Sequence, residues 1–265
     1  MSDLTNDVKQ HIQEQEWRDS QLKYLPHYLQ GTSMGGLVTL LVASEMQDKL
    51  AGLILVSPAV VPPADLFGWY GKLLKTFSWL LSLLLPKLAV IQLPTTPFEN
   101  LALEFYGDPL TYHGKLRCRP GREMLVSYDT IHKRKQLITV PCIIFSGSLD
   151  TQVNPEGIKR FYDEIPSKDK ELNTMEGLWH DLLHEPNGEV VRQKIYTWLY
   201  KRVPGIIKQE VKKSFKFEDY LPEEPEEPED PYVDGEEGEY AEDTQNADGE
   251  AEQNAEGKQA YDDNQ

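Results

Sequence analysis

A glycine-rich motif, GTSMG at residues 31–35, is the feature that most constrains this chain. It matches the pattern G-x-S-x-G, and a further glycine follows at position 36. Such a motif predicts a sharp turn with Ser33 at its tip, because Gly31 and Gly35 leave room for a tight backbone crossing. An ordinary glycine-rich turn between a strand and a helix is the alternative interpretation.

Apolar runs and helix-compatible segments alternate along the chain on both sides of this motif. The strand-like runs are 25–30, 52–57 (GLILVS), 140–146 (VPCIIFS) and 171–175, and the helix-like segments are 3–18, 37–45, 158–165 and 190–202. Continuous apolar runs between breakers are typical of parallel strands that are buried on both faces. The alternation therefore predicts an α/β fold with a mostly parallel sheet flanked by helices.

The negative charge is concentrated in a tail. Residues 218–265 hold 20 of the 44 acidic residues and one of the 27 basic residues. This segment contains no Ile, Phe, Trp or Met, so burial of its side chains does not offset the entropy lost on ordering. We predict a disordered acidic tail. The remainder is nearly neutral, which argues against a nucleic-acid-binding protein, because such proteins carry a basic stripe.

Several other classes of protein are excluded by composition. Cys118 and Cys142 are too few for a disulfide framework or a zinc site, and they fit a reducing compartment, as in a cytosolic enzyme. None of the six histidines has the spacing of a metal-binding motif, so we predict no metal. The N-terminus has no signal-peptide pattern. The longest mostly apolar run, Phe77–Leu85, has nine residues and is too short to span a bilayer.

A serine nucleophile needs a base, and the base needs an acid that orients it. Asp150 follows the run 140–146 and His180 follows the run 171–175, so both stand at predicted strand ends, where open α/β sheets carry catalytic groups. Asp150 is alternatively a plain turn residue, and His184, about one helical turn further on, competes with His180. The remaining histidines lack any motif and are interpreted as structural or solvated: His11, His27, His113 and His132.

Four segments resemble the monoglyceride lipase branch of the α/β-hydrolases, which is grouped with the serine aminopeptidase-like hydrolases. They are LQGTSMGG (29–36), GDPL (107–110), VPCIIFSGSLDTQVNP (140–155) and EGLWHDLLHEP (176–186). The resemblance covers roughly residues 1–203. It implies that Ser33 is the nucleophile, Asp150 the acid and His180 the base, and that the backbone N–H of Met34 donates to the oxyanion.

The resemblance also implies a domain organisation, a partial α/β-hydrolase fold with a helical cap insertion. Residues 1–61 would be the first part of the core with the nucleophile elbow, 62–135 the cap, 136–217 the second part of the core, and 218–265 the tail. In the family, the cap binds the acyl chain and touches membranes. The segment WYGKLLKTFSWLLSLLLPKL within 62–135 is apolar, aromatic and basic, which suits a membrane interface, although a helix packed on the core is the alternative.

For function, the resemblance implies a serine hydrolase that cleaves the ester of a lipid such as a monoacylglycerol, through an acyl-enzyme and without a cofactor. The expected partners are a lipid ester and a membrane surface, but no nucleic acid, and the expected location is cytoplasmic or peripheral on membranes. A lysophospholipase or a general carboxylesterase is a neighbouring alternative, because the cap decides the substrate. A catalytically weak or inactive interaction protein that keeps part of the fold is an alternative of another class.

The chain departs from the family in two places. Thr32 replaces the histidine that usually precedes the serine, and we expect only modest consequences. About thirty residues precede Ser33, and they match only the helix and strand that lead into the elbow, without the loop that supplies a second oxyanion N–H. We expect residues 25–30 to form an exposed edge strand and the lost donor to lower turnover by about 10²–10³. A truncated gene model, a shortened isoform and a hydrolase-like protein with lost activity would each fit this departure.

Overall fold

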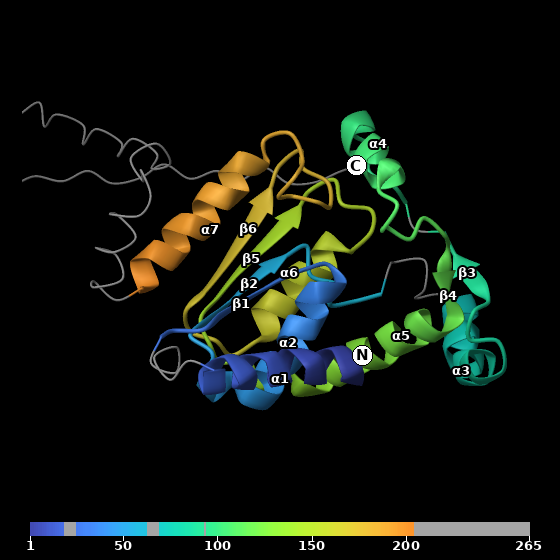
Figure 1. The fold of residues 1–265 in the computed structure, drawn as a ribbon, viewed down its shortest axis with the longest axis horizontal. Coiled ribbons are helices and arrows are strands. Elements are labelled where there is room, and N and C mark those ends of the chain that lie inside the picture. Colours follow the sequence, from blue (N-terminus) through green and yellow to red (C-terminus); the bar gives the residue numbers. More distant parts are fainter. Residues whose placement is uncertain (19–24, 63–68, 93, 204–265) are drawn as a thin grey trace, which may run out of the picture. The chain divides into compact units, whose positions relative to one another are not determined.

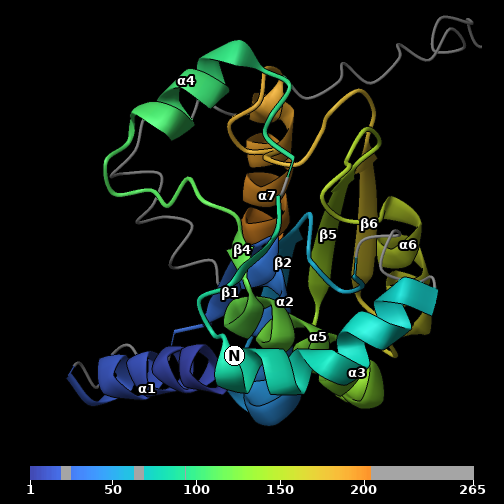
Figure 2. The same cartoon turned by 90° about the vertical axis from the view of Figure 1, so that its right-hand side faces the viewer.

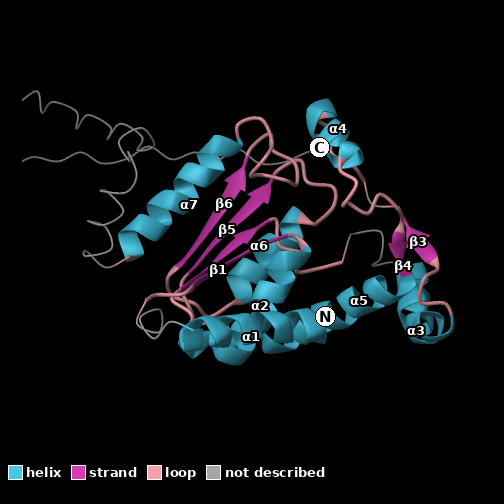
Figure 3. Ribbon diagram, in the orientation of Figure 1, coloured by secondary structure: helices cyan, strands magenta, loops and turns pink. Residues whose placement is uncertain are grey.

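The computed structural model describes residues 1–18, 25–62, 69–92 and 94–203. They form a central parallel sheet with helices on both faces and an insertion between two of its strands (Figure 1, Figure 3). The α/β class predicted from the alternating runs is therefore confirmed. The predicted acidic tail at 218–265 lies outside the described residues.

The sheet has four parallel strands in the order β1-β2-β5-β6. They are β1 (Tyr28–Thr32), β2 (Gly52–Val56), β5 (Cys142–Gly147) and β6 (Lys170–Met175). Thr32 pairs with Val56, Val56 with Phe145, and Gly147 with Met175. Because the strands are parallel and end at the same level of the sheet, their carboxyl ends lie side by side at one end of it. Open α/β sheets bind their ligands at this end.

Helices cover both faces of this sheet. The helical segments outside the insertion are α1 (Ser2–Arg18), α2 (Met34–Met46), α6 (Pro155–Glu164) and α7 (Gly188–Arg202), with short 3₁₀ turns η2 (Gln47–Lys49) and η4 (Lys135–Leu137). In Figure 1, α7 lies on one side of the strands, and α2 and α6 lie on the other. The sheet is thus the middle layer of three.

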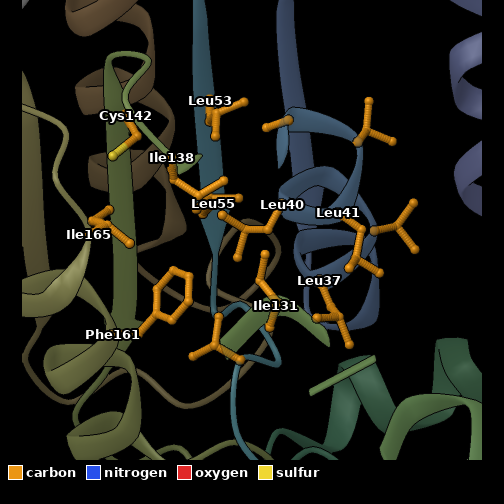
Figure 4. Close-up of a cluster of buried hydrophobic side chains, with 14 of the residues drawn as sticks. Leu37, Leu40, Leu41, Leu53, Leu55, Ile131, Ile138, Cys142, Phe161 and Ile165 are labelled. Atoms are coloured by element: carbon orange, nitrogen blue, oxygen red, sulfur yellow. The ribbon is translucent and has the colours of Figure 1, made fainter. Parts of the chain in front are cut away.

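Strand β2 shows why the buried strands read as continuous apolar runs. Leu53 and Leu55 join a cluster with buried side chains of α2 and α6 (Figure 4). Ile54 and Val56 point to the opposite face and join a second cluster that includes Trp198 of α7. Side chains alternate between the two faces of a strand, and here both faces are covered, so every position must be apolar.

The insertion between β2 and β5 contains α3 (Trp69–Leu84), β3 (Ala89–Ile91), α4 (Glu99–Gly107), β4 (Leu116–Arg117) and α5 (Cys118–Arg134). Strands β3 and β4 form a small antiparallel ribbon. In Figure 2, α4 and α3 lie far apart, at the top and bottom of the view. Tyr128 and Ile131 of α5 are buried in the same cluster as Leu55, so this helix ends within the core. The division of the chain at 62 and 135 stays a prediction.

Strand β1 begins and ends later than the sequence predicts. The apolar run suggested 25–30, whereas the strand covers Tyr28–Thr32, because Gly31 and Thr32 still pair with Leu55 and Val56. Within the described residues, β1 pairs only with β2, so it is an edge strand of the sheet, as expected. Among these residues no helix combines the length and the apolar composition needed to cross a membrane.

The burial of β2 predicts a large effect of truncating one of its side chains. Leu55→Ala should lower the free energy of unfolding by about 2–5 kcal/mol, because it removes a fully buried side chain and leaves a cavity. The matched control is Leu103→Ala, at an exposed position on α4, which should change it by less than about 0.5 kcal/mol. Urea denaturation of the three proteins measures both values, and equal effects of the two substitutions would contradict the assigned core.

Candidate active site

The structure brings three predicted residues to the same end of the sheet. Ser33 follows β1, Asp150 follows β5 and His180 follows β6. Since β1 and β5 flank β2, and β6 lies beside β5, the three residues come from strand ends that span the whole sheet. They lie 117 and 30 residues apart in the sequence, so the parallel topology is what assembles them.

Ser33 sits in a strained turn between β1 and α2. Its backbone has φ +53° and ψ −118°, a positive φ that a residue with a Cβ rarely adopts. Its N–H donates to the carbonyl of Val56 at 2.9 Å, and its carbonyl accepts from the N–H of Ala59 at 2.9 Å. The end of β2 thus holds the serine backbone from both sides. This is the geometry of a nucleophile elbow, in which a tight turn exposes the hydroxyl at the end of the sheet.

The glycines around Ser33 differ in how closely other atoms approach them. A Cβ on Gly31 would collide with the carbonyl of Gly35 and the hydroxyl of Thr39, so the crossing of β1 and α2 requires glycine there. A Cβ on Gly36 would lie 2.8 Å from Cβ of Pro58. A Cβ on Gly35 would meet nothing within 4 Å among the described residues. The prediction that both Gly31 and Gly35 make room for the backbone crossing is therefore wrong for Gly35. The second close approach is at Gly36, which packs against Pro58 in the loop after β2.

Asp150 is held by backbone donors and faces His180. Its Oδ1 accepts hydrogen bonds from the N–H groups of Gln152 at 2.8 Å and Val153 at 3.0 Å. Its Oδ2 lies 2.7 Å from Nδ1 of His180, and both side chains are buried. A carboxylate oxygen only accepts, so Nδ1 donates and the lone pair of the neutral imidazole is on Nε2. The arrangement is that of an acid that orients a base.

The loop that carries His180 packs closely on the end of β5. A Cβ on Gly147 would collide with the carbonyl of Trp179, so only glycine allows this approach. The Trp179 indole donates to the hydroxyl of Thr151 at 2.9 Å, and its ring lies edge-on to the His180 ring at 5.8 Å. The backbone N–H of Trp179 donates to the buried carboxylate of Glu185 at 2.6 Å.

The other histidines have different environments. His184 pairs its Nδ1 with Asp181 at 2.7 Å, but the pair is exposed and belongs to one short turn. The structure therefore gives His180, and not its predicted competitor, the buried acid. His132 contacts the carbonyl of Val60 at 3.1 Å, and His113 contacts that of Phe105 at 2.6 Å, which agrees with structural roles.

A cavity of about 1200 Å³ opens at this end of the sheet. Ser33, Met34 and His180 line it on the side of the sheet. The insertion lines the other side with aromatic, apolar and polar side chains, which include Leu101, Phe105, Tyr106, Asp108, Tyr112, His113 and Arg117. The sequence did not indicate that these insertion residues line a cavity. Asp108 belongs to the segment GDPL (107–110), the others belong to no motif, and only the fold brings them together. In the described ranges, no three His, Cys, Asp or Glu side chains are grouped as metal ligands would be.

Comparisons of this chain with known proteins agree on one family. A family model described as "Serine aminopeptidase, S33" matches residues 1–187. Monoglyceride lipase of Rattus norvegicus is 27% identical over 186 residues, which cover 68% of this chain and 60% of the rat protein. Caffeoylshikimate esterase of Arabidopsis thaliana is 30% identical over 194 residues, which cover 68% of this chain and 57% of that protein. The chain thus spans less than two thirds of the length of these relatives.

Solved structures support the same fold. The crystal structure of the monoacylglycerol lipase from Paleococcus ferrophilus superimposes with a TM-score of 0.62 at 23% identity, over 74% of this chain and 73% of that one. A soluble variant of the Saccharomyces cerevisiae monoglyceride lipase, solved with a substrate analogue, also gives 0.62 at 22% identity, over 77% and 69% of the two chains. The resemblance read from the four sequence segments is therefore confirmed at the level of family and fold.

The contrast between the two elbow glycines is testable. Gly31→Ala should lower the free energy of unfolding by about 1–3 kcal/mol, because its Cβ collides with backbone atoms that have no room to move. Gly35→Ala should leave the free energy of unfolding unchanged or raise it by up to about 1 kcal/mol, because the position is helical and open. Urea denaturation of both variants measures the difference, and a more harmful effect at Gly35 would contradict the described crossing.

Proposed function

Because this chain belongs to the serine aminopeptidase S33 family of the α/β-hydrolases, we propose that it hydrolyses the carboxylic ester of a lipid of the monoacylglycerol class. The observation that carries the proposal is the buried Asp150–His180 pair, which opens on the same cavity as the strained Ser33 elbow. The similarity to monoglyceride lipases of rat and human favours an ester substrate.

In the proposed reaction, Nε2 of His180 takes the proton of the Ser33 hydroxyl as Oγ attacks the ester carbonyl carbon. Asp150 stabilises the imidazolium that forms and keeps the ring in one tautomer. The tetrahedral intermediate then expels the alcohol, which receives its proton from His180, and an acyl-serine remains. Water attacks this acyl group with His180 again as base, and the carboxylic acid leaves. The cycle returns every group to its starting protonation state and needs no cofactor.

The backbone N–H of Met34 is the oxyanion donor that the proposal assigns. Met34 is the first residue of α2, so its N–H belongs to the four at the start of the helix that have no partner within it. The helix dipole favours negative charge at the same place. Elbow hydrolases pair this donor with a second N–H from another loop.

The size and lining of the cavity suit an amphiphilic ester. Its volume of about 1200 Å³ exceeds the roughly 300–1,000 Å³ that is usual for small-molecule sites, which leaves space for an acyl chain. Leu101, Phe105 and Tyr106 offer apolar surface, whereas Asp108 and Arg117 offer polar groups for an alcohol headgroup. This mixture of surfaces favours a lipid ester over a fully polar substrate.

We extend the proposal to contact with a membrane through α3. This helix exposes a run of large apolar side chains, whose members with the largest exposed fractions are Trp79 (60%), Leu83 (63%) and Leu84 (65%). Exposed apolar patches of this kind commonly mark an interaction surface. Lys75 precedes the run but pairs with Asp129 at 2.6 Å, so the basic residue beside the apolar face that suits an anionic lipid surface is Lys87, just beyond the run. A lipid substrate would then reach the cavity from the bilayer.

The catalytic proposal predicts labelling of Ser33 by a fluorophosphonate probe. The parent chain should be labelled, and Ser33→Ala and His180→Ala should lose at least about 99% of the labelling rate, because nucleophile and base act as one unit. The matched control is Ser44→Ala, further along the same helix, which should label like the parent. A folded parent chain that does not react would favour the inactive interaction protein, and unchanged labelling of Ser33→Ala would contradict the assignment.

The membrane proposal predicts binding to vesicles of phosphatidylcholine and phosphatidylserine. The double substitution Trp79→Ser and Leu83→Ser should weaken partitioning about tenfold or more, because each side chain loses the free energy of burial in the bilayer interface. The control is Leu4→Ser, at an exposed position on α1, which should bind like the parent. Co-sedimentation measures the bound fraction, and equal binding of the parent and the double variant would exclude α3 as the contact.

A further inference from the structure

A second acid, Glu185, is buried beneath the loop that carries His180. Its side chain belongs to a residue that is only 3% exposed, although carboxylates are rarely buried without a partner. Its Oε2 accepts the backbone N–H of Trp179 at 2.6 Å, and this bond is also buried. Trp179 directly precedes His180, so the carboxylate holds the Leu178–Trp179 peptide, one residue before the base.

The turn around Glu185 is held by its own backbone as well. The Glu185 N–H donates to the carbonyl of Asp181 at 3.1 Å, and the Glu185 carbonyl accepts from Gly188 at 2.8 Å. The chain therefore leaves His180, turns once and brings the carboxylate back under Trp179 before α7 begins at Gly188. A hydrogen bond to an ionised acceptor is shorter and stronger than a neutral one, in keeping with the 2.6 Å separation.

The surroundings of Glu185 are unfavourable for a residue whose role is only structural. Its other oxygen, Oε1, is also buried and has no hydrogen-bond partner within the described part of the chain. An unsatisfied buried acceptor is costly, and an apolar residue or a shorter polar one would avoid that cost. Glu185 does not line the cavity either, so it does not contact a substrate held there. What it does contact is the amide one residue before the base.

We propose that Glu185 is a positioning residue for the hydrolase reaction: it fixes the Leu178–Trp179 peptide, which leads into His180, so that the imidazole faces Ser33. The proposal rests on the proposed function of this site. Asp150 fixes the ring of His180 through its side chain, and Glu185 fixes the main chain from which that ring extends. Two independent anchors hold the base, because a base that rotates away from the nucleophile loses the alignment on which the rate depends.

The test compares Glu185→Ala with Glu185→Gln. The alanine variant removes the acceptor and should lower kcat about 10- to 100-fold with KM within about twofold, because the loss is one of alignment and not of substrate binding. The glutamine variant keeps an oxygen that accepts the Trp179 N–H and should recover kcat to within about fivefold of the parent. Glu189→Gln, at an exposed residue of α7 that pairs with Arg192, is the matched control and should behave like the parent.

Two-dimensional NMR of the full chain tests the inference without activity. A 2.6 Å bond to a carboxylate should move the amide proton of Trp179 downfield, and Glu185→Gln should move it upfield while the amides of α7 stay in place. The proton on Nδ1 of His180 should broaden in Glu185→Ala, since the ring loses its fixed orientation. These signals report the anchor even if the chain hydrolyses no ester, so failure of the proposed function is distinguishable.

The inference fails if Glu185→Ala folds and keeps kcat within about twofold of the parent. It also fails if Glu185→Gln leaves the Trp179 amide shift unchanged, because the carboxylate then does not bind that amide. A glutamine variant that is as slow as the alanine variant would likewise overturn it, since the acceptor would not be what matters. If the alanine variant does not fold, the glutamine variant alone decides through its kcat and the Trp179 resonance.

Discussion

The pairing of the two buried strands β2 and β5 is the constraint on which this structure depends. Each is covered on both faces, and their parallel register fixes the height at which the neighbouring strands end. Ser33 is tied by hydrogen bonds to the end of β2, and Asp150 follows the end of β5. Any shift of one strand past the other would move Ser33 away from Asp150 and His180. Apolar burial therefore sets the geometry of the polar site.

Strain and unsatisfied groups gather at the end of the sheet where the site lies. Ser33 and Ser57 both have positive φ, and they follow β1 and β2, respectively. Within the described residues, the buried hydroxyls of Ser57 and Ser146 and one oxygen of Glu185 have no hydrogen-bond partner. Such features cost free energy of folding. The apolar core offsets them, as it does the buried Trp198 Nε1 and Arg202 Nε, which also have no hydrogen-bond partner within the described residues.

The sequence predicted the sheet and the candidate site far better than the insertion. Strands β2 and β5 are visible in the sequence as apolar runs, because burial on both faces leaves no freedom in residue type. Asp150 and His180 were found because parallel strands bring their ends together, so position after a strand was enough. The residues from α4 to β4 that line the cavity were not found, because their side chains face a hollow whose shape depends on long-range packing. The role of Gly36 was missed for the same reason, since it depends on Pro58 in another loop.

Strand β1 has one neighbouring strand within the described residues, yet the strained Ser33 that follows it is held in place. The contacts of Ser33 explain this, because its backbone bonds to Val56 at the end of β2, to Ala59 in the loop that follows, and to Leu37 of α2. The close crossing at Gly31 likewise involves atoms of α2. The elbow is thus held from the inner side of the sheet, by elements that are themselves buried. The direction of Ser33 therefore depends on the buried core, whereas the outer edge of β1 affects the tendency of the strand to pair with other chains.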